Sequence, residues 1–276
     1  MIKRILPLVL AGLALTSTGR AVDIVAHRGA SYDAPENTLA SNRLAWEQGT
    51  DVVETDIYLT KDGQLVVLHD KNTKRTTGQE LVPAQSTLDE LRALDAGSWK
   101  GPQFKGEKLP TFEEQIALIP AGKRMFVEIK VGPEIVPAIA RCLKKTGATP
   151  KMITFISFNY DALKAVREEL PEYKTQYLAG YKAPDSAPAK KSKKPAKPQP
   201  TIDEVIAQAK AAGFTGLDLQ STWPLTPADV KKIKDAGLEL HVWTVDDPEV
   251  AKHWVQLGTE SITTNRPGWL RAQLKG

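Results

Sequence analysis

Short apolar runs, many of them rich in β-branched residues, alternate along the chain with longer amphipathic stretches. The runs predict strands at Asp23–His27, Asp51–Ile57, Met125–Lys130, Met152–Phe158, Thr175–Leu178, Phe214–Leu219, Leu238–Thr244 and Ser261–Thr264. The stretches between and after them predict helices at Leu39–Gln48, Thr111–Leu118, Val136–Thr146, Tyr160–Glu169, Ile202–Ala212, Pro227–Ala236, Pro248–Leu257 and Trp269–Leu274. Strands that alternate with helices in this way are typical of a parallel sheet.

The number and spacing of these elements favour a closed (β/α)8 barrel, or TIM barrel, over a doubly wound sheet. Eight strand–helix pairs fit in about 250 residues, which is the usual size of such a barrel. Pro227 and Pro248 stand at first helical positions, and Gly147 and Gly258 follow helix ends, as helix boundaries prefer. We therefore expect one α/β domain over residues 22–276.

The alternation is interrupted after the second predicted strand. The sequence Thr60-Lys61-Asp62-Gly63 separates two apolar runs, which predicts a hairpin that returns over Gln64–His69. The excursion continues to about residue 108 and includes a predicted short helix near Leu88–Leu94. Because it is too long for a simple connection, we interpret residues 60–108 as a small insertion that caps the mouth of the barrel.

Charge is distributed unevenly along the chain. The net charge is +4, of which residues 1–21 contribute +3 and residues 181–200 contribute +5, which leaves −4 for the rest. A nucleic-acid-binding protein would carry basic charge on its folded body, so we expect no nucleic-acid partner. Residues 181–200 are rich in Lys, Pro and Ala and predict a flexible loop, with weak contact to anionic surfaces as an alternative role.

The N-terminus predicts an export signal. Two basic residues precede an apolar run over residues 5–15, and Gly19-Arg20-Ala21 suits signal cleavage. The run is too short to span a bilayer, which needs about 20 residues. We expect residues 1–21 to be removed, so that the mature chain has no transmembrane segment and is periplasmic or secreted. The single cysteine, Cys142, cannot form an internal disulfide and is interpreted as a buried apolar residue.

Carboxylates lie near the ends of two predicted strands, where the active site of an α/β barrel forms. Glu54 and Asp56 are two residues apart on one strand and so point to the same face, and Glu128 lies on the next strand. Three neighbouring carboxylates repel one another unless positive charge lies between them. A hard cation with oxygen ligands, Mg²⁺ or Ca²⁺, would supply that charge. A lattice of ion pairs with Arg28 and Lys130 is the alternative.

Two of the four histidines also follow predicted strands. His27 ends the first strand, and His69 ends the return of the hairpin. Because an imidazole gains or loses a proton near neutral pH, two of them suit a reaction that needs both an acid and a base. Arg28 and Lys130 add fixed positive charge, which together with a cation suits the transfer of a phosphoryl group.

These residues form part of an ordered set of motifs that resembles the glycerophosphodiester phosphodiesterases over essentially the whole mature length. The motifs are His27-Arg28-Gly29, Pro35-Glu36-Asn37-Thr38, Glu54-Thr55-Asp56, Thr60-Lys61-Asp62-Gly63, His69-Asp70, Arg75-Thr76-Thr77-Gly78, Glu128-Ile129-Lys130 and Val242-Trp243-Thr244-Val245. Each motif alone is weak, but the ordered set is highly specific. The resemblance implies a (β/α)8 barrel with an insertion after the second strand. It also implies metal-dependent hydrolysis of small glycerophosphodiesters to an alcohol and sn-glycerol 3-phosphate.

The resemblance also implies roles for the residues at the strand ends. His27 and His69 correspond to the acid/base pair of the family, with His27 favoured as the base. Glu54, Asp56 and Glu128 correspond to the ligands of one divalent cation, Mg²⁺ or Ca²⁺. The sequence leaves the choice between these two ions open.

The remaining roles concern the substrate and the support of the site. Arg28 and Lys130 would bind the phosphate, and Trp243 would pack against the glycerol. Glu36 and Asn37 would brace the site, or instead cap the helix that follows them.

Three features depart from the family pattern or leave a choice open. Asn265 stands where many relatives have an aspartate, and we expect little effect on catalysis. Phe158 ends the fourth predicted strand and either lines the pocket or packs in the core. Residues 181–200 lie outside the family pattern and follow the fifth strand, so they start on the side of the active site.

Two other functions fit the same residues. The first is a phospholipase-type phosphodiesterase that acts on lysophospholipids or sphingolipids, because two histidines and three acids would serve there too. The second is an envelope binding protein that keeps the barrel without catalysis, against which the intact set of charged and imidazole positions argues.

Overall fold

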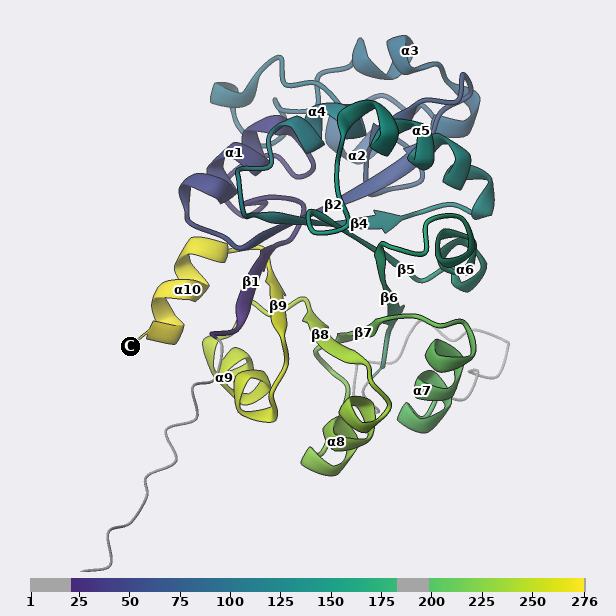
Figure 1. Ribbon diagram of the computed structural model, residues 1–276. Helices are drawn as coiled ribbons and strands as arrows, with labels where there is room; N and C mark the ends of the chain where they lie inside the picture. The colour runs from purple at the N-terminus through teal and green to yellow at the C-terminus, as the bar shows by residue number, and fades with distance from the viewer. Residues whose placement is uncertain (1–20, 183–198, 276) are drawn as a thin grey trace, which may run out of the picture.

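A computed structural model describes residues 21–182 and 199–275, and it shows a closed barrel of parallel strands. The barrel closes because β1 pairs with both β2 and β9 (Figure 1). Its strands are β1 Asp23–Ala26, β2 Val52–Leu59, β4 Arg124–Ile129, β5 Ile153–Ser157, β6 Lys174–Ala179, β7 Gly216–Gln220, β8 Glu239–Trp243 and β9 Ser261–Thr264. The predicted (β/α)8 fold is confirmed, and each predicted strand is present.

Helices surround the barrel on the outside (Figure 1). They are α1 Leu39–Glu47, α4 Phe112–Ala117, α5 Val136–Thr146, α6 Tyr160–Glu169, α7 Ile202–Ala211, α8 Pro227–Asp235, α9 Pro248–Leu257 and α10 Pro267–Lys275, with a short 3₁₀ turn, η3 Pro133–Ile135, before α5. Threonine side chains cap several helix starts, as Thr201 does for α7 and Thr226 for α8. None of the helices in these residues is long and apolar enough to cross a membrane.

The insertion after the second strand begins with the predicted hairpin. Strand β3, Leu65–Val67, pairs antiparallel with the end of β2. The rest contains α2 Lys74–Thr77, η1 Pro83–Gln85, α3 Leu88–Arg92 and η2 Pro102–Phe104. Helix α3 was predicted, whereas the single turn α2 was not, because four residues are too few to show helical periodicity. Lys100 Nζ donates a 2.7 Å hydrogen bond to the carbonyl of Ser31, which fastens the insertion to the loop after β1.

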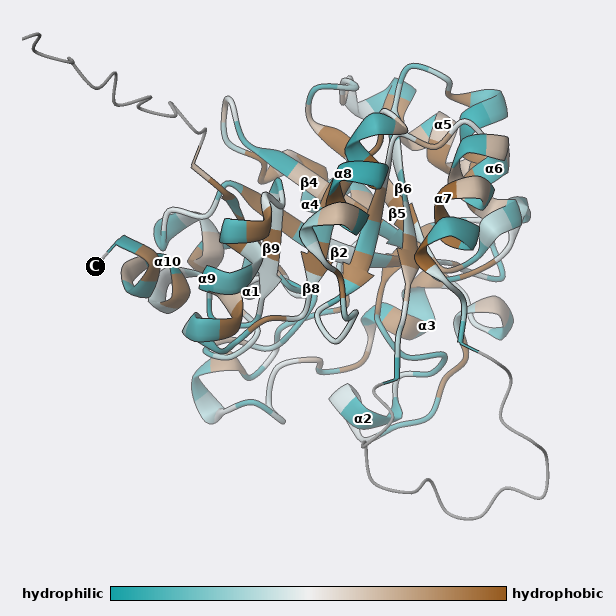
Figure 2. Ribbon diagram, turned by 90° about the horizontal axis from the view of Figure 1, so that it is seen from below, coloured by the Kyte–Doolittle hydropathy of each residue, from teal (hydrophilic) through white to brown (hydrophobic). Residues whose placement is uncertain are grey.

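Side chains alternate between the two faces of each strand, and this alternation separates two hydrophobic clusters. The large cluster lies between the strands and the surrounding helices. A small cluster fills part of the barrel interior and comprises Val25, Val52, Phe126, Ile156 and Leu178. Figure 2 shows hydrophobic colour concentrated on the strands, whereas the surrounding helices carry both hydrophobic and hydrophilic colour. On β2 and β4 the inward residues that follow this cluster toward the C-terminal strand ends are polar: Glu54 and Asp56 follow Val52, and Glu128 follows Phe126.

Two sequence predictions lie wholly or mainly outside the described residues. The export signal covers residues 1–21, of which only the last is described, and most of the Lys/Pro-rich segment 181–200 falls in the gap between β6 and α7. Both stay predictions.

Candidate active site

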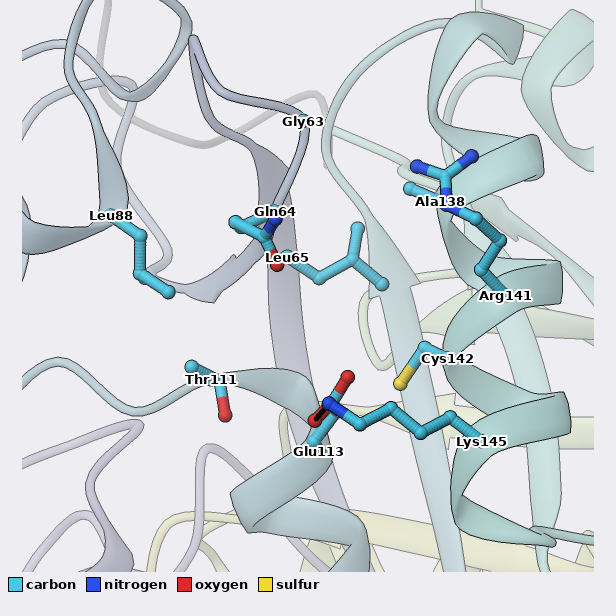
Figure 3. Close-up of a pocket in the computed structure, with 10 residues that line it drawn as sticks. All are labelled: Gly63, Gln64, Leu65, Leu88, Thr111, Glu113, Ala138, Arg141, Cys142 and Lys145. Atoms are coloured by element: carbon cyan, nitrogen blue, oxygen red, sulfur yellow. Dashed lines mark hydrogen bonds and ion pairs between the residues drawn. The ribbon is translucent and has the colours of Figure 1, made fainter.

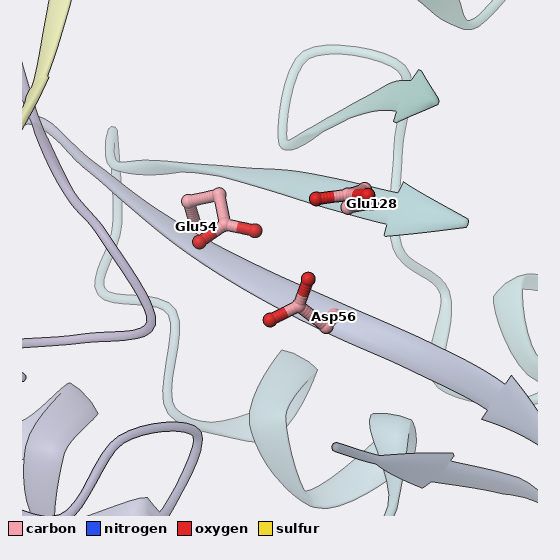
Figure 4. A group of neighbouring side chains, drawn as sticks. All are labelled: Glu54, Asp56 and Glu128. Carbon is pink, nitrogen blue, oxygen red and sulfur yellow. The ribbon is translucent and has the colours of Figure 1, made fainter. Parts of the chain in front are cut away.

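Glu54, Asp56 and Glu128 form a compact group at the mouth of the barrel. Glu54 and Asp56 lie on β2, and Glu128 lies beside Asp56 on β4 (Figure 4). Each offers one carboxylate oxygen, and these three oxygens lie within 4.8 Å of one another. All three side chains are largely buried, so water screens their mutual repulsion poorly. The strand alternation in the sequence predicted this convergence.

The pKa values of the three carboxyl groups differ because positive charge reaches them unequally. Burial and then the neighbouring carboxylates raise the pKa of Glu54 well above its usual value, and they raise that of Glu128 to about 7. Burial acts on Asp56 in the same direction, but Lys130 and Arg28 outweigh it and lower the pKa of Asp56. Without a further cation, the group therefore carries less than its full negative charge near neutral pH.

The ion-pair lattice considered as the alternative to a metal is present but incomplete. Lys130 Nζ lies 2.7 Å from Glu128 Oε1 and 3.3 Å from Asp56 Oδ1, and Arg28 Nε lies 3.6 Å from Asp56 Oδ2. Glu54 makes no ion pair among the described residues and accepts only the backbone N–H of Arg28, at 2.9 Å. The buried Oδ1 of Asp56 accepts no hydrogen bond. The Glu54 carboxylate, which has no ion pair among the residues described, and Asp56 Oδ1, which has no hydrogen bond there, fit the oxygen ligands of a hard divalent cation.

The loop after β1 adopts unusual backbone conformations where it supports this group. Arg28 and Asn37 have positive φ angles of 56° and 59°, which non-glycine residues rarely adopt. Asn37 uses its amide Nδ2 to donate a 2.7 Å hydrogen bond to Asp56 Oδ2. Gly29 is required because a Cβ there would overlap Ser41 at the start of α1. The loop thus holds both Arg28 and Asn37 against Asp56 Oδ2.

A chain of charged side chains supports His69 from outside the pocket. His69 Nδ1 lies 2.7 Å from Asp70 Oδ1, and Arg75 on α2 donates from Nε to Asp70 Oδ2, also at 2.7 Å. Two further nitrogens of Arg75 donate to Glu36, which also accepts from Arg28 at 3.0 Å. Hydrogen bonds from Arg75 hold the pKa of Asp70 at about 2, so this carboxylate stays ionised beside His69.

His27 has a different partner. Its Nδ1 lies 2.7 Å from Asn265 Oδ1, and the amide nitrogen of Asn265 donates to Asp246 Oδ2 at 2.6 Å. Because the NH₂ end of the amide is bound to a carboxylate, its oxygen must face His27, and His27 must carry its proton on Nδ1. That tautomer leaves Nε2 as an acceptor. Burial and then Arg28 lower the pKa of His27 to about 4, so the ring is neutral at neutral pH.

A pocket of about 130 Å³ joins most of these groups. It is lined by the predicted residues His27, Arg28, Glu54, His69, Glu128, Lys130 and Trp243, and by Ile156, Phe158, Leu178, Asp218, Thr244 and Thr263. Phe158 is 47% exposed, so it lines the pocket and is not a core residue. Its ring packs edge-on against Trp243 at a centroid distance of 5.4 Å. One wall of the pocket is therefore charged and the opposite wall is mainly apolar.

Several contributors to this site were not recognised from sequence alone. The hydrogen bond from His27 Nδ1 to Asn265 Oδ1 links residues 238 positions apart, so local spacing gives no sign of it. Asp70 and Arg75 were noticed only as parts of motifs. Asp218 stands in the middle of an otherwise apolar strand, and that isolated acid was the one signal that could have singled it out.

A larger cavity, of about 430 Å³, lies elsewhere, between the β2–β3 hairpin and α5 (Figure 3). Glu113 and Lys145 on its lining pair with each other at 2.7 Å, and Arg141 is the remaining charged residue of the lining. Cys142 also borders it, and burial raises the pKa of this thiol to about 12, so it is not a nucleophile at neutral pH. None of the predicted site residues lines this cavity.

Comparison with known proteins identifies relatives along almost the whole chain. The model of the Glycerophosphoryl diester phosphodiesterase family matches residues 27–269. A glycerophosphodiester phosphodiesterase of Caldanaerobacter subterraneus is 32% identical over 88% of this chain and 94% of its own length. A glycerophosphodiester phosphodiesterase of Bacillus subtilis is 29% identical over 91% of this chain and 86% of its own.

Solved structures show the same relationship. A phosphodiesterase of Oleispira antarctica, determined in complex with the product sn-glycerol-3-phosphate, is 30% identical and superposes with a TM-score of 0.79. The match covers 92% of this chain and 97% of that one.

The carboxylate group predicts that the response to divalent cations depends on pH. Glu128 must lose its proton to act as a ligand, and its pKa of about 7 lies above the unfolded value of 4.5. In metal-free protein, this raised pKa contributes stability below pH 4.5 that is lost as the pH rises through 7. Mg²⁺ or Ca²⁺ should therefore raise the melting temperature more at pH 7.5 than at pH 5.5, as measured by calorimetry.

Glu128→Gln provides the matched control, because the amide is isosteric and does not titrate. This variant should show a weaker pH dependence without metal and little stabilisation by either ion. An equal rise in melting temperature at both pH values, or an unchanged response in Glu128→Gln, would contradict the assignment.

Proposed function

The chain belongs to the glycerophosphoryl diester phosphodiesterase family and is a phosphodiester hydrolase, and we propose that it converts small glycerophosphodiesters into an alcohol and sn-glycerol 3-phosphate with the help of one divalent cation. The observation that carries this proposal is that one pocket brings together two histidines, the carboxylate group, Arg28 and Lys130. The product bound to the Oleispira antarctica relative is in accord with it.

Arg28 and Lys130 are proposed to hold the phosphate. Both line the pocket, and both retain their positive charge because Asp56 raises the pKa of each against the effect of burial. A divalent cation on Glu54, Asp56 and Glu128 would act there as a Lewis acid toward the phosphoryl oxygens. The two cationic side chains lie beside these carboxylates, so a phosphate that they bind would lie next to the proposed cation.

His27 is proposed as the base. Asn265 and Asp246 hold its proton on Nδ1, so Nε2 accepts a proton from the nucleophile. A hydroxyl of the substrate's own glycerol can serve as that nucleophile. Its attack forms a new P–O bond and breaks the bond to the alcohol, which gives a cyclic phosphate. Water then opens the ring to glycerol 3-phosphate.

His69 is proposed as the acid. Burial, Arg28 and Lys130 together lower the pKa of His69 below its usual value, and the ionised Asp70 carboxylate at Nδ1 acts against them by favouring the protonated ring. The protonated ring can give a proton to the departing alcohol. Asn265, being neutral, offers His27 no such charge. The two histidines therefore differ in the charge of their partners, and that difference is the basis for assigning their roles.

A second substrate class is favoured by one observation. Phe158, Ile156, Leu178 and Trp243 form an apolar wall, and the Phe158 ring is partly exposed at its rim. Such a wall could also accept the apolar part of a lysophospholipid. A direct comparison of glycerophosphocholine with lysophosphatidylcholine as substrates decides between the two classes.

The activity itself is tested by the release of glycerol 3-phosphate from glycerophosphocholine, with purified mature protein. We expect release that stops with EDTA and returns when Mg²⁺ or Ca²⁺ is restored, because the carboxylates then regain their cation. His27→Ala and His69→Ala should each lower kcat by about 100-fold or more while the fold is retained. No release with any metal from either substrate class would leave only a binding role. Near wild-type turnover of both histidine variants would overturn the acid/base pair.

The partner of His27 predicts a shift in the pH profile. In the double variant Asn265→Asp with Asp246→Asn, the carboxylate and the amide exchange places and a carboxylate faces His27. The pKa of His27, about 4 in the wild type, should then rise, because a negative charge favours the imidazolium. The acidic limb of kcat/KM should move upward by about one pH unit or more.

The single variant Asp246→Asn is the control, since it leaves an amide against His27. Its acidic limb should stay near that of the wild type. A limb that does not move in the double variant would show that His27 does not set it.

We also propose that the protein acts after export and is periplasmic or secreted, with residues 181–200 in weak contact with anionic surfaces. The basic residues and apolar run before Gly19-Arg20-Ala21 support export, and the lysines of the segment support the contact. Fractionation of cells that express the full chain, with and without residues 182–199, measures both compartment and surface attachment. Full-length protein confined to the cytoplasm would contradict export.

A further inference from the structure

Asp218 on β7 is a buried carboxylate without a partner at the active-site pocket. The residue is 1% exposed and lines the pocket beside Glu128, Thr263 and Trp243. Its Oδ1 is buried and accepts no hydrogen bond, and its side chain makes no hydrogen bond or ion pair with any residue that the structure describes. Burial and then Glu128 raise the pKa of Asp218 well above its usual value. A buried carboxyl group with no hydrogen-bond partner destabilises a fold in either protonation state, so its presence calls for a partner outside the folded chain.

The register of the sheet shows that Asp218 faces the barrel interior. Its neighbour on β6 is Leu178, which belongs to the interior cluster, and its neighbour on β8 is His241. His241 does not compensate it, because its two ring nitrogens already lie 2.7 Å from Ser261 Oγ and Gln176 Nε2. The strands around Asp218 thus provide polar groups, but these bind one another and leave Asp218 alone.

Two further observations concern the surroundings of Asp218 in the pocket. The indole nitrogen of Trp243 donates a 3.0 Å hydrogen bond to the backbone carbonyl of Asp218, so the ring and the residue are fixed together. Thr263 on β9 also lines the pocket, and its buried Oγ1 likewise has no hydrogen-bond partner. Two unpartnered side-chain oxygens therefore border the pocket that Arg28 and Lys130 also line.

We propose that Asp218, assisted by Thr263, binds a hydroxyl group of the polyol part of the substrate and so selects for polyol phosphates over simple alkyl phosphates. This inference rests on the proposed function, because it assumes that the phosphate lies at Arg28 and Lys130. A hydroxyl supplies the missing partner for a carboxyl oxygen, and the carbon chain that bears it packs on Trp243. Asp218 is thus a specificity-determining residue and takes no part in proton transfer.

A hydroxyl is a better match to this place than the other candidates. An ammonium group would lack a second carboxylate beside Asp218, since Glu128 is already paired with Lys130 at 2.7 Å. An apolar group would leave both oxygens without partners, which retains the cost of burying them. A hydroxyl both donates and accepts, so one group can serve Asp218 and Thr263 together.

The test compares two ligands that differ only in their hydroxyl groups, sn-glycerol 3-phosphate and n-propyl phosphate. Calorimetric titration in the presence of the divalent cation measures the affinity of each for the wild type and for Asp218→Leu. The wild type should bind glycerol 3-phosphate at least about fivefold more tightly than propyl phosphate. In Asp218→Leu that ratio should fall to about one, while the affinity for propyl phosphate is retained.

Stability gives an independent readout, because a structural role and a binding role predict opposite results. Replacing the unpartnered carboxylate by leucine should leave the melting temperature unchanged or raise it. Ser261→Ala is the matched control, since Ser261 is also buried in the barrel but contacts His241 and does not line the pocket. It should lower the melting temperature and keep the affinity ratio of the wild type.

The outcomes separate this inference from the proposed function. If the wild type cleaves glycerophosphocholine but Asp218→Leu keeps its preference for glycerol 3-phosphate, the inference is wrong and the function stands. A wild type that shows no preference between the two ligands also overturns the inference. If the wild type neither cleaves glycerophosphocholine nor binds glycerol 3-phosphate, the proposed function fails and the inference fails with it. If Asp218→Leu folds poorly, Asp218→Asn takes its place. This variant should lower the ratio of the affinities for glycerol 3-phosphate and propyl phosphate by less than Asp218→Leu would. An unchanged ratio in Asp218→Asn contradicts the inference.

Discussion

The repulsion among three buried carboxylates is the constraint on which the rest of the site depends. Glu54, Asp56 and Glu128 converge because strand alternation and the β2–β4 register place them side by side. Burying their negative charges in a poorly hydrated pocket costs free energy unless positive charge neutralises them. Arg28 and Lys130 neutralise part of it, which leaves room for a cation and, through that cation, for a phosphate. The same charges that make the cluster costly to bury are those that would bind the proposed cation.

The two histidines have different partners outside the pocket, and the roles proposed for them rest on that difference. Both rings are held through Nδ1 at 2.7 Å, which leaves Nε2 of each ring for the proposed proton transfer. They differ because one partner is an amide and the other is a carboxylate whose charge Arg75 maintains. The barrel makes this asymmetry possible, since His27 is supported from β9 and His69 from the insertion. The insertion is therefore part of the active site and does more than cover it.

The fold was largely predictable from the sequence, and the site was predictable in part, for physical reasons. Strand and helix periodicities are local signals, and each predicted strand and barrel helix is present in the structure. The convergence of Glu54 with Asp56 also follows from local spacing. The pairing of His27 with Asn265 does not, because it depends on how β1 and β9 meet when the barrel closes. The turn α2, which carries Arg75, was missed because one turn of helix leaves no periodic pattern.

Asn265 illustrates why a departure from a motif is hard to weigh before the structure is known. From the sequence, an amide in place of a carboxylate was expected to have little effect on catalysis. In the structure, that amide is hydrogen-bonded at both ends, to His27 and to Asp246. The group in direct contact with the His27 ring is therefore uncharged. A carboxylate at the same position would favour the imidazolium and so oppose the use of His27 as a base. The substitution and the presence of Asp246 therefore belong together: Asp246 orients the amide, and the amide keeps His27 neutral.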